Sequence, residues 1–339
     1  MVQVFLSLFF VAAVSTALTG LFRGYAVKNS LLDRPNPRSS HVVPTPRGGG
    51  MAIVVAFLVA SLFLWRSDLV PAKVVFIITG CGGLVALIGC VDDHRHLRPL
   101  VRFCTHAASA AAALFLLDHF PSLPLFTGTV DPGVPGYILG GVSLVWLLNL
   151  YNFMDGIDAI AGLEAISVAG GGAFIIWYNQ GDQGYAFWLL LLAAATAGFL
   201  VWNWPPAKIF MGDGGSGFLG FVLGILAIAS SIDGAINVWS WMILFGVFLV
   251  DATVTLIRRV FRGEIFYKAH RSHAYQVLAR RLGSHLKISL AALGINLFWL
   301  FPLAFLASSF SQWGVACMVV ALTPLVFLAV KVGAGTSNE

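Results

Sequence analysis

The run YAFWLLLLAAATAGFLVWN at residues 185–203 contains no charged side chain. A helix needs about 20 mostly apolar residues to cross the hydrocarbon of a bilayer, so this run predicts a transmembrane helix. Ten further apolar runs lie between charged or Pro/Gly-rich breaks, and we therefore expect an all-α, polytopic integral membrane protein with about eleven transmembrane helices. The expected spans are 2–22, 48–65, 72–91, 103–118, 136–151, 159–178, 185–203, 217–231, 236–257, 287–308 and 312–331.

The composition of the whole chain also indicates a membrane protein. Of its 339 residues, 58% are hydrophobic and only 10% are charged, and the mean hydropathy is +0.87. A soluble domain carries about 25% charged residues, and with this composition it would expose large apolar patches. A soluble enzyme, a disordered chain and a nucleic-acid binder are thereby excluded. The cysteines lie in or beside apolar runs, at spacings that suit neither a zinc site nor a disulfide framework (Cys81, Cys90, Cys104 and Cys317).

Basic residues are concentrated in alternate loops, and this predicts the orientation in the membrane. With residue 1 outside, the segments 23–47, 92–102, 204–216 and 258–287 and the C-terminus hold 18 of the 20 Lys and Arg residues. In membrane proteins the cytoplasmic loops carry the excess of basic residues. We therefore expect a retained first helix, an external N-terminus, a cytoplasmic C-terminus and one transmembrane domain over residues 1–339.

Two adjacent carboxylates close the third expected span. Asp92 and Asp93 stand at a membrane boundary, where their mutual repulsion is stronger than in water. A divalent cation such as Mg²⁺, which prefers hard oxygen ligands, would relieve this repulsion. The alternative is a solvated helix end whose counter-charge comes from Arg95 and Arg98.

Amides and carboxylates are interspersed where the fifth expected span ends and the sixth begins, in the run NLYNFMDGID. The ends of this run, Asn149 and Asp158, would lie on opposite sides of one straight helix. We therefore expect the helix to break near Gly156, so that Asn152, Asp155 and Asp158 converge from two segments. Such a group suits a sugar or a nucleotide. The alternative is a polar turn with Asp158 as the N-cap of the next helix.

A glycine-rich turn precedes the eighth expected span. Four glycines surround Asp213 in the run MGDGGSG that starts at Met211. The backbone N–H groups of such a turn, including those of Gly212 and Gly214, can approach a phosphate closely, and the following helix N-terminus favours an anion. The alternative is a flexible connector or close helix packing.

The segment 258–287 is strongly basic, with eight Lys and Arg residues against one Glu. Anchoring to anionic lipid headgroups accounts for most of them. It does not account for His270 and His273, which flank Arg271. If this stretch is helical, the two imidazoles share a helical face, and with Arg271 they can grip a diphosphate. Two further carboxylates lie inside expected spans and are candidates for helix pairing or for support of the site, namely Glu164 and Asp251.

Four motifs follow one another along the chain: DDHRH (92–96), NLYNFMDGID (149–158), FMGDGGS (210–216) and HRSH (270–273). Together they resemble the polyprenyl-phosphate N-acetylhexosamine-1-phosphate transferases of glycosyltransferase family 4, which include MraY and WecA. The stretches DRPNPR (33–38) and PRGGG (46–50) resemble the first cytoplasmic loop of that family. MraY-like members carry a triple His, and a Lys after the paired aspartates, where this sequence has HRSH and His96. The sequence is therefore most similar to the WecA-like branch that initiates O-antigen synthesis, and within it to WbpL.

The resemblance implies transfer of a sugar 1-phosphate from a UDP-N-acetylhexosamine to undecaprenyl phosphate with release of UMP, as the first step of O-antigen, lipopolysaccharide or related cell-envelope glycan synthesis. It implies Mg²⁺, with Mn²⁺ as an alternative, and a site on the cytoplasmic face of the bacterial inner membrane, and it allows a homodimer. The expected site residues are, as catalytic groups, Asp92, Asp93, Asp155, Asp158 and His270; as metal ligands, Asp92, Asp93 and Asp213; and as substrate-binding groups, Asn149, Asn152, Gly212, Gly214, Arg271, His273 and Arg102.

Two other functions compete with this one. A secondary transporter would place carboxylates at mid-span, paired across repeats, whereas these carboxylates lie at one membrane boundary. A membrane lipid-phosphate hydrolase would release inorganic phosphate without a sugar donor. The motifs do not identify the sugar, because the binding free energies of donors that differ at one hydroxyl or methyl differ by only about 1–3 kcal/mol.

Overall fold

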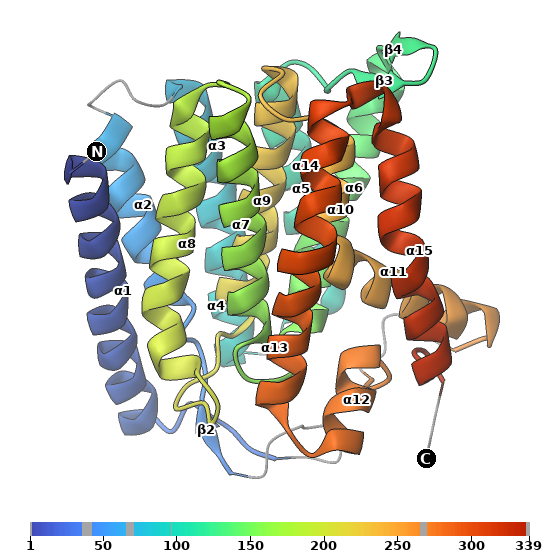
Figure 1. The fold of residues 1–339 in the computed structure, drawn as a ribbon. Helices are drawn as coiled ribbons and strands as arrows, with labels where there is room; N and C mark the ends of the chain where they lie inside the picture. Colours follow the sequence, from blue (N-terminus) through green and yellow to red (C-terminus); the bar gives the residue numbers. More distant parts are fainter. Residues whose placement is uncertain (1, 36–42, 66–70, 96, 265–269, 337–339) are drawn as a thin grey trace.

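The computed structural model describes residues 2–35, 43–65, 71–95, 97–264 and 270–336. Within them the chain forms a helical bundle (Figure 1), in which nine helices are long and apolar enough to cross a membrane. A bent pair makes a tenth if it forms one span, and the apolar helix α2 (Met51–Trp65) is shorter. The all-α polytopic fold is confirmed, whereas the count of eleven spans and the orientation stay predictions. His96 lies outside the described residues.

The helices follow the expected apolar runs, because a helix keeps its backbone hydrogen bonds internal, as the hydrocarbon requires. The first half contains α1 (Val2–Lys28), α2, α3 (Ala72–Ile77), α4 (Gly83–Arg95), α5 (Pro99–Leu117) and α6 (Gly133–Met154). The second half contains α7 (Ile160–Tyr178), α8 (Gln183–Asn203), α9 (Asp213–Ile232), α10 (Val238–Leu244), α11 (Gly246–Phe261), α12 (Ala274–Leu282), α13 (His285–Ile295), α14 (Phe301–Ser309) and α15 (Gly314–Val332). The π-helical segment η1 (Ile78–Gly82) joins α3 to α4, the π-helical segment η2 (Asn296–Leu300) joins α13 to α14, and the 3-10 helix η3 (Ser311–Trp313) precedes α15.

The ninth expected span, 236–257, is not one straight helix. Helices α10 and α11 are bent by 77° at the residue between them, Phe245. Gly246 opens α11 and has no room for a side chain, because an added Cβ would lie 2.8 Å from Leu322 Cδ2 and 2.9 Å from Leu300 Cδ1. Segments η2 and α15 therefore pack directly against the bend.

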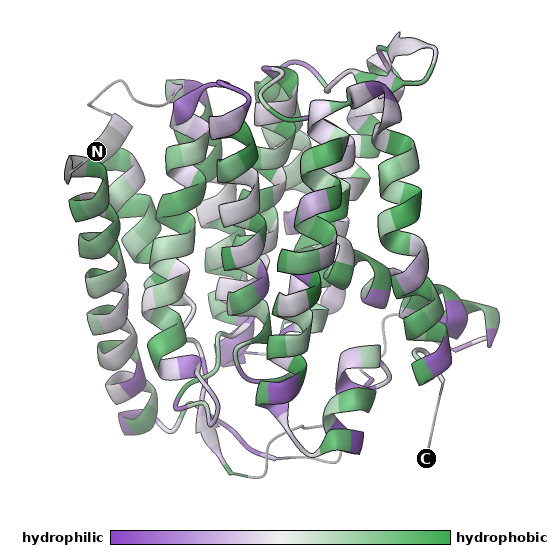
Figure 2. Ribbon diagram, in the orientation of Figure 1, coloured by the Kyte–Doolittle hydropathy of each residue, from purple (hydrophilic) through white to green (hydrophobic). Residues whose placement is uncertain are grey.

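Polar residues gather at the two ends of the bundle, while apolar residues cover most of its length (Figure 2). One end carries the antiparallel pair of β1 (Leu32–Asp33) and β2 (Thr45–Pro46), in which Leu32 lies opposite Pro46. The other end carries the antiparallel hairpin of β3 (Leu123–Leu125) and β4 (Gly128–Val130). This hairpin lies in the proline-rich connection between the fourth and fifth expected spans.

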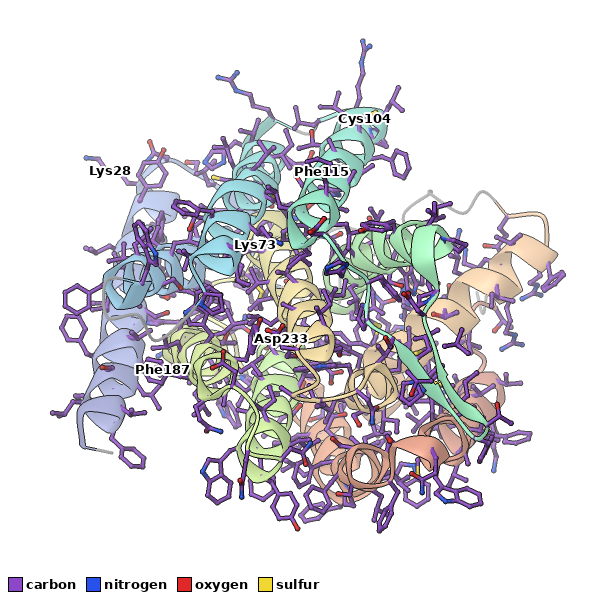
Figure 3. The ribbon with its side chains drawn as sticks, turned by 90° about the horizontal axis from the view of Figure 1, so that it is seen from above. Lys28, Lys73, Cys104, Phe115, Phe187 and Asp233 are labelled. Atoms are coloured by element: carbon purple, nitrogen blue, oxygen red, sulfur yellow. The ribbon has the colours of Figure 1, made fainter. Side chains whose placement is uncertain are left out.

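Helix α9 lies at the centre of the bundle, and this position decides where polar groups can meet. In the view from above, the other helices surround α9, and Asp233 marks its near end (Figure 3). Of the most apolar 18 residues of α9, 83% are buried. Its glycines allow close packing, since an added Cβ at Gly220 would lie 2.5 Å from the carbonyl oxygen of Leu147 on α6. Asp213, the first residue of α9, therefore lies at the end of the central helix opposite Asp233.

Substitution of Gly89 by alanine should destabilise the protein. Gly89 on α4 faces the start of α9, and an added Cβ would lie 2.6 Å from the carbonyl carbon and oxygen of Asp213. Overpacking of this kind costs about 1–3 kcal/mol, so we expect Gly89→Ala to lower the midpoint of thermal unfolding in detergent. Gly83→Ala on the same helix is the control, because an added Cβ there meets no atom within 4 Å. Equal midpoints for the two variants would contradict this packing.

Candidate active site

Two arginines and three aspartates from four segments of the chain meet at the start of α9. Arg47 Nε lies 2.8 Å from Asp93 Oδ1, and the same guanidinium also pairs with Asp213. Arg102 Nη1 lies 2.6 Å from Asp92 Oδ2 and 3.2 Å from Asp213 Oδ2. Asp213 therefore bridges the two arginines. We name these five residues the charged cluster.

The backbone of the glycine-rich turn is wrapped around Asp93. Asp93 Oδ1 accepts the N–H of Asp213 at 3.0 Å, and Asp93 Oδ2 accepts the N–H of Gly214 at 3.4 Å. A carboxylate suits this position, because the first N–H groups of a helix are unpaired and carry partial positive charge. The Gly214 N–H therefore faces Asp93 in this structure, and its expected role toward a substrate phosphate stays a prediction. Gly212 has a φ of +80°, and an added Cβ there would collide with the Asp93 carboxylate, so this turn requires glycine.

The loop before α2 is fixed against the turn before α9, and this positions Arg47. The Gly50 N–H donates to the Met211 carbonyl oxygen at 2.8 Å. An added Cβ at Gly50 would lie 2.5 Å from Gly215 Cα, so the two backbones touch where neither residue has a side chain. The guanidinium of Arg47 is thereby held over the carboxylates at the start of α9.

The break expected within the run NLYNFMDGID is confirmed, since five residues separate the end of α6 from the start of α7. Asn152, in the last turn of α6, donates to Ser216 Oγ in the first turn of α9 at 3.3 Å. Asp155, in the break, interacts electrostatically with Arg47 and with Asp213. These two residues add an amide and a carboxylate to the charged cluster.

Asp158 and Asn149 have other partners, so the expected convergence of the whole run is only partial. The Asp158 carboxylate lies 3.3 Å from His285 Nδ1 and accepts the N–H of Ala207 at 3.1 Å, which ties the start of α7 to α13 and to the turn before α9. The alternative role of Asp158 as an N-cap is also wrong, because Ala159 occupies that position. Asn149 donates to the carbonyl oxygen four residues earlier on its own helix, at 2.7 Å.

Negative charge exceeds positive charge in this part of the described chain. Burial raises the pKa of Asp155 well above its ordinary value; Arg47 lowers it, and the carboxylates of Asp213, Asp93 and Asp158 raise it further. Burial lowers the pKa of Arg47, but Asp213 and Asp93 outweigh that effect and leave the pKa above its ordinary value. The charged cluster alone brings three carboxylates against two guanidinium groups. A bound cation would relieve this excess.

The HRSH segment is not helical, so the condition for a helical face shared by His270 and His273 is not met. His273 is the N-cap of α12, and the two imidazole rings stack with their centroids 4.8 Å apart. His273 is buried, with its Nδ1 3.4 Å from Asp251 Oδ1, so its surroundings are those of a structural residue. Arg271 is exposed and His270 is partly exposed, and both remain accessible to a substrate.

Helix α12 is docked on the break between α6 and α7. Asp251 on α11 accepts the N–H groups of Ala274 at 2.8 Å and Tyr275 at 2.9 Å. Tyr275 Oη donates to the Phe153 carbonyl oxygen at 2.9 Å. Asp251 therefore joins α11 to α12, which is the helix pairing for which it was a candidate. Tyr275 was not identified from the sequence, because a single tyrosine in a polar helix gives no signal.

Comparison with known proteins identifies the family. The family model described as glycosyl transferase family 4 matches residues 75–231. The decaprenyl-phosphate N-acetylglucosaminephosphotransferase of Mycolicibacterium smegmatis is 30% identical across 94% of this chain and 85% of its own length. This chain belongs to glycosyl transferase family 4. A second relative is the probable undecaprenyl-phosphate N-acetylglucosaminyl 1-phosphate transferase of Bacillus subtilis, 29% identical over 79% of this chain and 76% of its own length. A third is the undecaprenyl-phosphate alpha-N-acetylglucosaminyl 1-phosphate transferase of Salmonella typhi, 26% identical over 78% of this chain and 74% of its own length.

Family 4 membership confirms the resemblance seen in the motifs and does not support a transporter or a lipid-phosphate hydrolase. The particular similarity to WbpL stays a prediction. The residues matched by the family 4 model, 75–231, include Asp92, Asp93 and Asp213 but not Arg47. Arg47 was also absent from the expected site residues, and its only signal was the PRGGG stretch, whose glycines permit the close backbone approach described above.

Removal of the Arg47 guanidinium should destabilise this family 4 protein. Arg47→Met leaves Asp93 and Asp213 with one cationic partner fewer, and loss of a partner from a partly buried pair costs about 1–3 kcal/mol. We expect a lower midpoint of thermal unfolding in detergent. Arg23→Met is the control, because Arg23 Nε bonds the Lys208 carbonyl oxygen at 3.3 Å at an exposed site. A fall of the same size in both variants would show that the charged cluster adds no stability of its own.

Proposed function

We propose that this chain transfers an N-acetylhexosamine 1-phosphate from a UDP-sugar to undecaprenyl phosphate and releases UMP. The observation that carries the proposal is the excess of carboxylates at one end of a membrane bundle, beside an apolar groove. Its relatives are named for transfer of N-acetylglucosamine phosphate to undecaprenyl phosphate or decaprenyl phosphate. The HRSH motif favours the branch that begins O-antigen or a related envelope glycan.

The chemistry of this transfer needs positioning more than proton abstraction. An oxygen of the prenyl phosphate attacks the phosphorus that carries the sugar, and the bond between that phosphorus and the bridging oxygen of the diphosphate breaks. The products are a prenyl-diphosphate sugar and UMP. Because a phosphate monoester has a second pKa of about 6, its oxygen is largely ionised at neutral pH. Alignment of the two reactants and neutralisation of phosphate charge then carry the catalysis.

The residues that would hold Mg²⁺ are the three aspartates of the charged cluster, Asp92, Asp93 and Asp213. Arg102 Nη1 lies 2.6 Å from Asp92 Oδ2 and 3.2 Å from Asp213 Oδ2, so these two carboxylates converge on one cationic group, and a bound cation would stabilise their approach further. The Asp93 carboxylate lies beside them, on Arg47 and on the first N–H groups of α9. Among the described residues no three His, Cys, Asp or Glu side chains are grouped as a metal site, but Mg²⁺ uses one or two carboxylates and takes water and substrate phosphates as its other ligands. When bound there, Mg²⁺ would neutralise charge on the donor diphosphate and on the leaving phosphate.

The other polar residues of the site bind and orient the two substrates in this proposal. Arg102 meets the phosphate of the prenyl acceptor, because it is the arginine on the helix that lines the apolar groove. Asn152 and Asp155 hold hydroxyl groups of the donor. Arg271 and His270, on the accessible segment before α12, bind the donor diphosphate.

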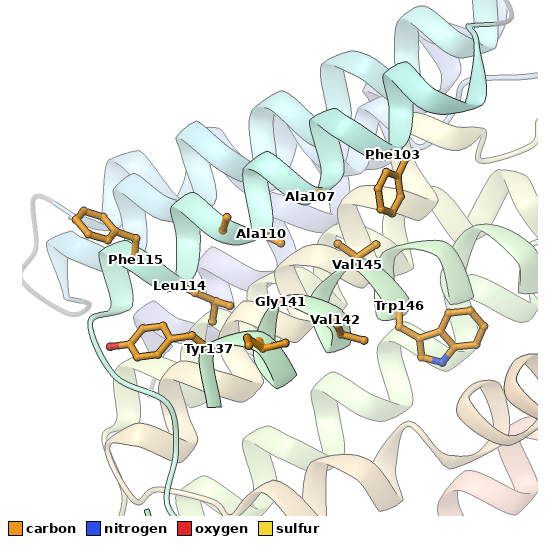
Figure 4. A pocket seen from close by; sticks show the side chains of 12 residues that line it. Phe103, Ala107, Ala110, Leu114, Phe115, Tyr137, Gly141, Val142, Val145 and Trp146 are labelled. Carbon is orange, nitrogen blue, oxygen red and sulfur yellow. The ribbon is translucent and has the colours of Figure 1, made fainter. Parts of the chain in front are cut away.

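An apolar groove runs between α5 and α6 and begins beside Arg102. Its volume is about 600 Å³, and its walls are almost entirely apolar side chains. Figure 4 shows Phe103 at one end and Phe115 with Tyr137 at the other, a distance of roughly 18 Å along a helix that rises 1.5 Å per residue. The groove can therefore take the first part of a prenyl chain while its phosphate meets Arg102. The remaining lining residues are Ala107, Ala110, Ala111, Leu114, Ile138, Gly141, Val142, Val145 and Trp146.

We propose further that the charged cluster faces the cytoplasm of a bacterial inner membrane. Arg23, at the end of α1, bonds to the turn that contains Lys208 and precedes α9, so these basic residues lie at the end of the bundle that holds the cluster. Lys73, one of the few basic residues expected outside, lies at the start of α3 and donates to the Leu117 carbonyl oxygen at 3.0 Å, at the opposite end. The excess of basic residues on the cytoplasmic side of membrane proteins supports this orientation.

Asp213→Asn and Asp93→Asn should each abolish turnover while leaving the protein folded. Both carboxylates neutralise charged groups at the start of α9, and loss of one electrostatic group at such a site costs at least about 100-fold in kcat. The measurement is release of UMP from a UDP-N-acetylhexosamine, with undecaprenyl phosphate and Mg²⁺. Asp131→Asn, in an exposed loop at the other end of the bundle, is the control. Full activity in either site variant would remove that residue from the site.

The proposed function itself is tested with a panel of UDP-N-acetylhexosamine donors, and the mass of the lipid product identifies the sugar. EDTA should stop UMP release and added Mg²⁺ or Mn²⁺ should restore it. Purified protein that releases no UMP from any of these donors would overturn the proposal. Inorganic phosphate formed from the lipid without a donor would identify a hydrolase instead.

A bulky side chain in the groove should weaken binding of the prenyl acceptor. Ala111→Trp fills the space between α5 and α6, and we expect the KM for undecaprenyl phosphate to rise about ten-fold, equivalent to about 1.4 kcal/mol, while the KM for the UDP-sugar changes by less than about two-fold. Ala112→Trp is the matched control, because Ala112 is exposed on the same helix and does not line the groove. The same KM for the acceptor in both variants would show that the prenyl chain binds elsewhere.

A further inference from the structure

A second group of polar side chains lies inside the bundle, and we name it the interior cluster. Glu164 on α7 and Asn296 in η2 are only 2% and 4% exposed, and Asn296 Nδ2 donates to Glu164 Oε2 at 2.6 Å. The same amide donates to Ser167 Oγ at 2.8 Å. Tyr151, fully buried on α6, interacts with Glu164 and completes the cluster. Polar groups at this depth are costly, and a carboxylate inside a membrane span is a candidate for function.

The interior cluster meets the bend between α10 and α11 through η2 and through Tyr151. Asn296, the partner of Glu164, is the first residue of η2, and Leu300 is its last. An added Cβ at Gly246, the first residue of α11, would lie 2.9 Å from Leu300 Cδ1, so η2 packs directly on the start of a helix that is bent by 77° from α10. The ring of Tyr151 packs on that of Phe248 in the first turn of α11, with the centroids 5.2 Å apart.

From α11 the contacts continue to the site described above. Asp251 lies three residues beyond Phe248 and holds the first N–H groups of α12. At the other side of α12, Tyr275 bonds to the Phe153 carbonyl oxygen, and an added Cβ at Gly156 would collide with Tyr275 Oη. Helix α12 thus rests directly on the break that contains Asp155.

We propose that Glu164 is a positioning residue. By holding Asn296 in η2, which packs on the start of α11, it fixes the bend between α10 and α11, and thereby the placement of α12 and of the preceding His270 and Arg271 over the break that contains Asp155. This inference rests on the proposed function, in which His270 and Arg271 bind the donor diphosphate. Loss of the Glu164 contacts should therefore weaken the binding of the donor and leave the binding of the prenyl phosphate unchanged.

The hydrogen-bonding inventory of the interior cluster distinguishes two substitutions at this position. Glu164 Oε1, Asn296 Oδ1 and Tyr151 Oη have no hydrogen-bond partner among the described residues. A glutamine keeps one acceptor oxygen and adds two N–H donors, for which Asn296 Oδ1 and Tyr151 Oη are acceptors. A leucine of similar size provides neither donor nor acceptor. Glutamine should therefore preserve the bend and leucine should release it.

The first experiment compares the KM values of Glu164→Leu and Glu164→Gln in the full chain, reconstituted in lipid nanodiscs. We expect Glu164→Leu to raise the KM for the UDP-sugar by at least about ten-fold and to keep the KM for undecaprenyl phosphate within about two-fold. Glu164→Gln should keep both within about two-fold. Tyr185→Phe is the control, because it removes a partly buried hydrogen bond to Asp233 at the opposite end of the bundle.

The second experiment measures the position of α12 without reference to activity. Spin labels are attached to cysteines introduced at Leu282 on α12 and at Lys28 on α1, both exposed, in a chain whose native cysteines are replaced. Glu164→Leu should shift or broaden the distance distribution between the labels, and Glu164→Gln should not. Asn296→Ala removes the partner of the carboxyl group; we expect the same result from it, and it takes the place of Glu164→Leu if that variant does not fold.

Three results would overturn the positioning role: an unchanged donor KM and label distance in Glu164→Leu, a Glu164→Gln protein as impaired as Glu164→Leu, or KM values for both substrates that rise together. The expected split between the two KM values, with rescue by glutamine, would establish it. Wild-type protein that releases no UMP would overturn the proposed function instead, and the label distances would still decide whether Glu164 holds α12 in place.

Discussion

Repulsion among carboxylates at a membrane boundary is the constraint on which the rest of the structure depends. Asp92, Asp93 and Asp213 are withdrawn from much of the solvent, and charges removed from water need partners close by. Arg47 and Arg102 supply two such partners, each bridging two of the carboxylates. Four separate segments must therefore meet at one point, and the positions of the loop before α2 and of helices α4, α5 and α9 are tied to that meeting.

Close contact between backbones allows these four segments to come together. Gly50 touches Gly215, and Gly89 touches the backbone of Asp213, so the chain segments approach more closely than side chains would allow. Since α9 is almost entirely buried, its first residue cannot move without disturbing the helices around it. Asp93 then satisfies the first N–H groups of α9 from the protein itself, so the turn is ordered before any ligand arrives.

Much of this architecture could be predicted from the sequence, because its signals are local. Apolar runs must be helical in hydrocarbon, and carboxylates at the ends of such runs need a common partner, which predicted the gathering of Asp92, Asp93 and Asp213. The remaining features depend on partners far away in the chain. Asp158 binds His285, and His273 faces Asp251. No neighbouring residue in the sequence indicates either pairing. Similarly, the basic residues of cytoplasmic loops look alike in sequence, so Arg47 could not be separated from its neighbours, and the bend at Phe245 depends on packing against η2 and α15.

The groove between α5 and α6 is open to the surrounding lipid along its length, since Phe103, Phe115 and Val142 among its lining residues are exposed. A hydrocarbon chain can enter such a channel sideways and never touch water. Because fluid lipid and an apolar protein wall are equally dry, binding in the groove depends on van der Waals packing rather than on removal from water. Only the part of the chain that fits between α5 and α6 gains such packing, so acceptors whose chains differ only beyond the groove compete for the enzyme on nearly equal terms.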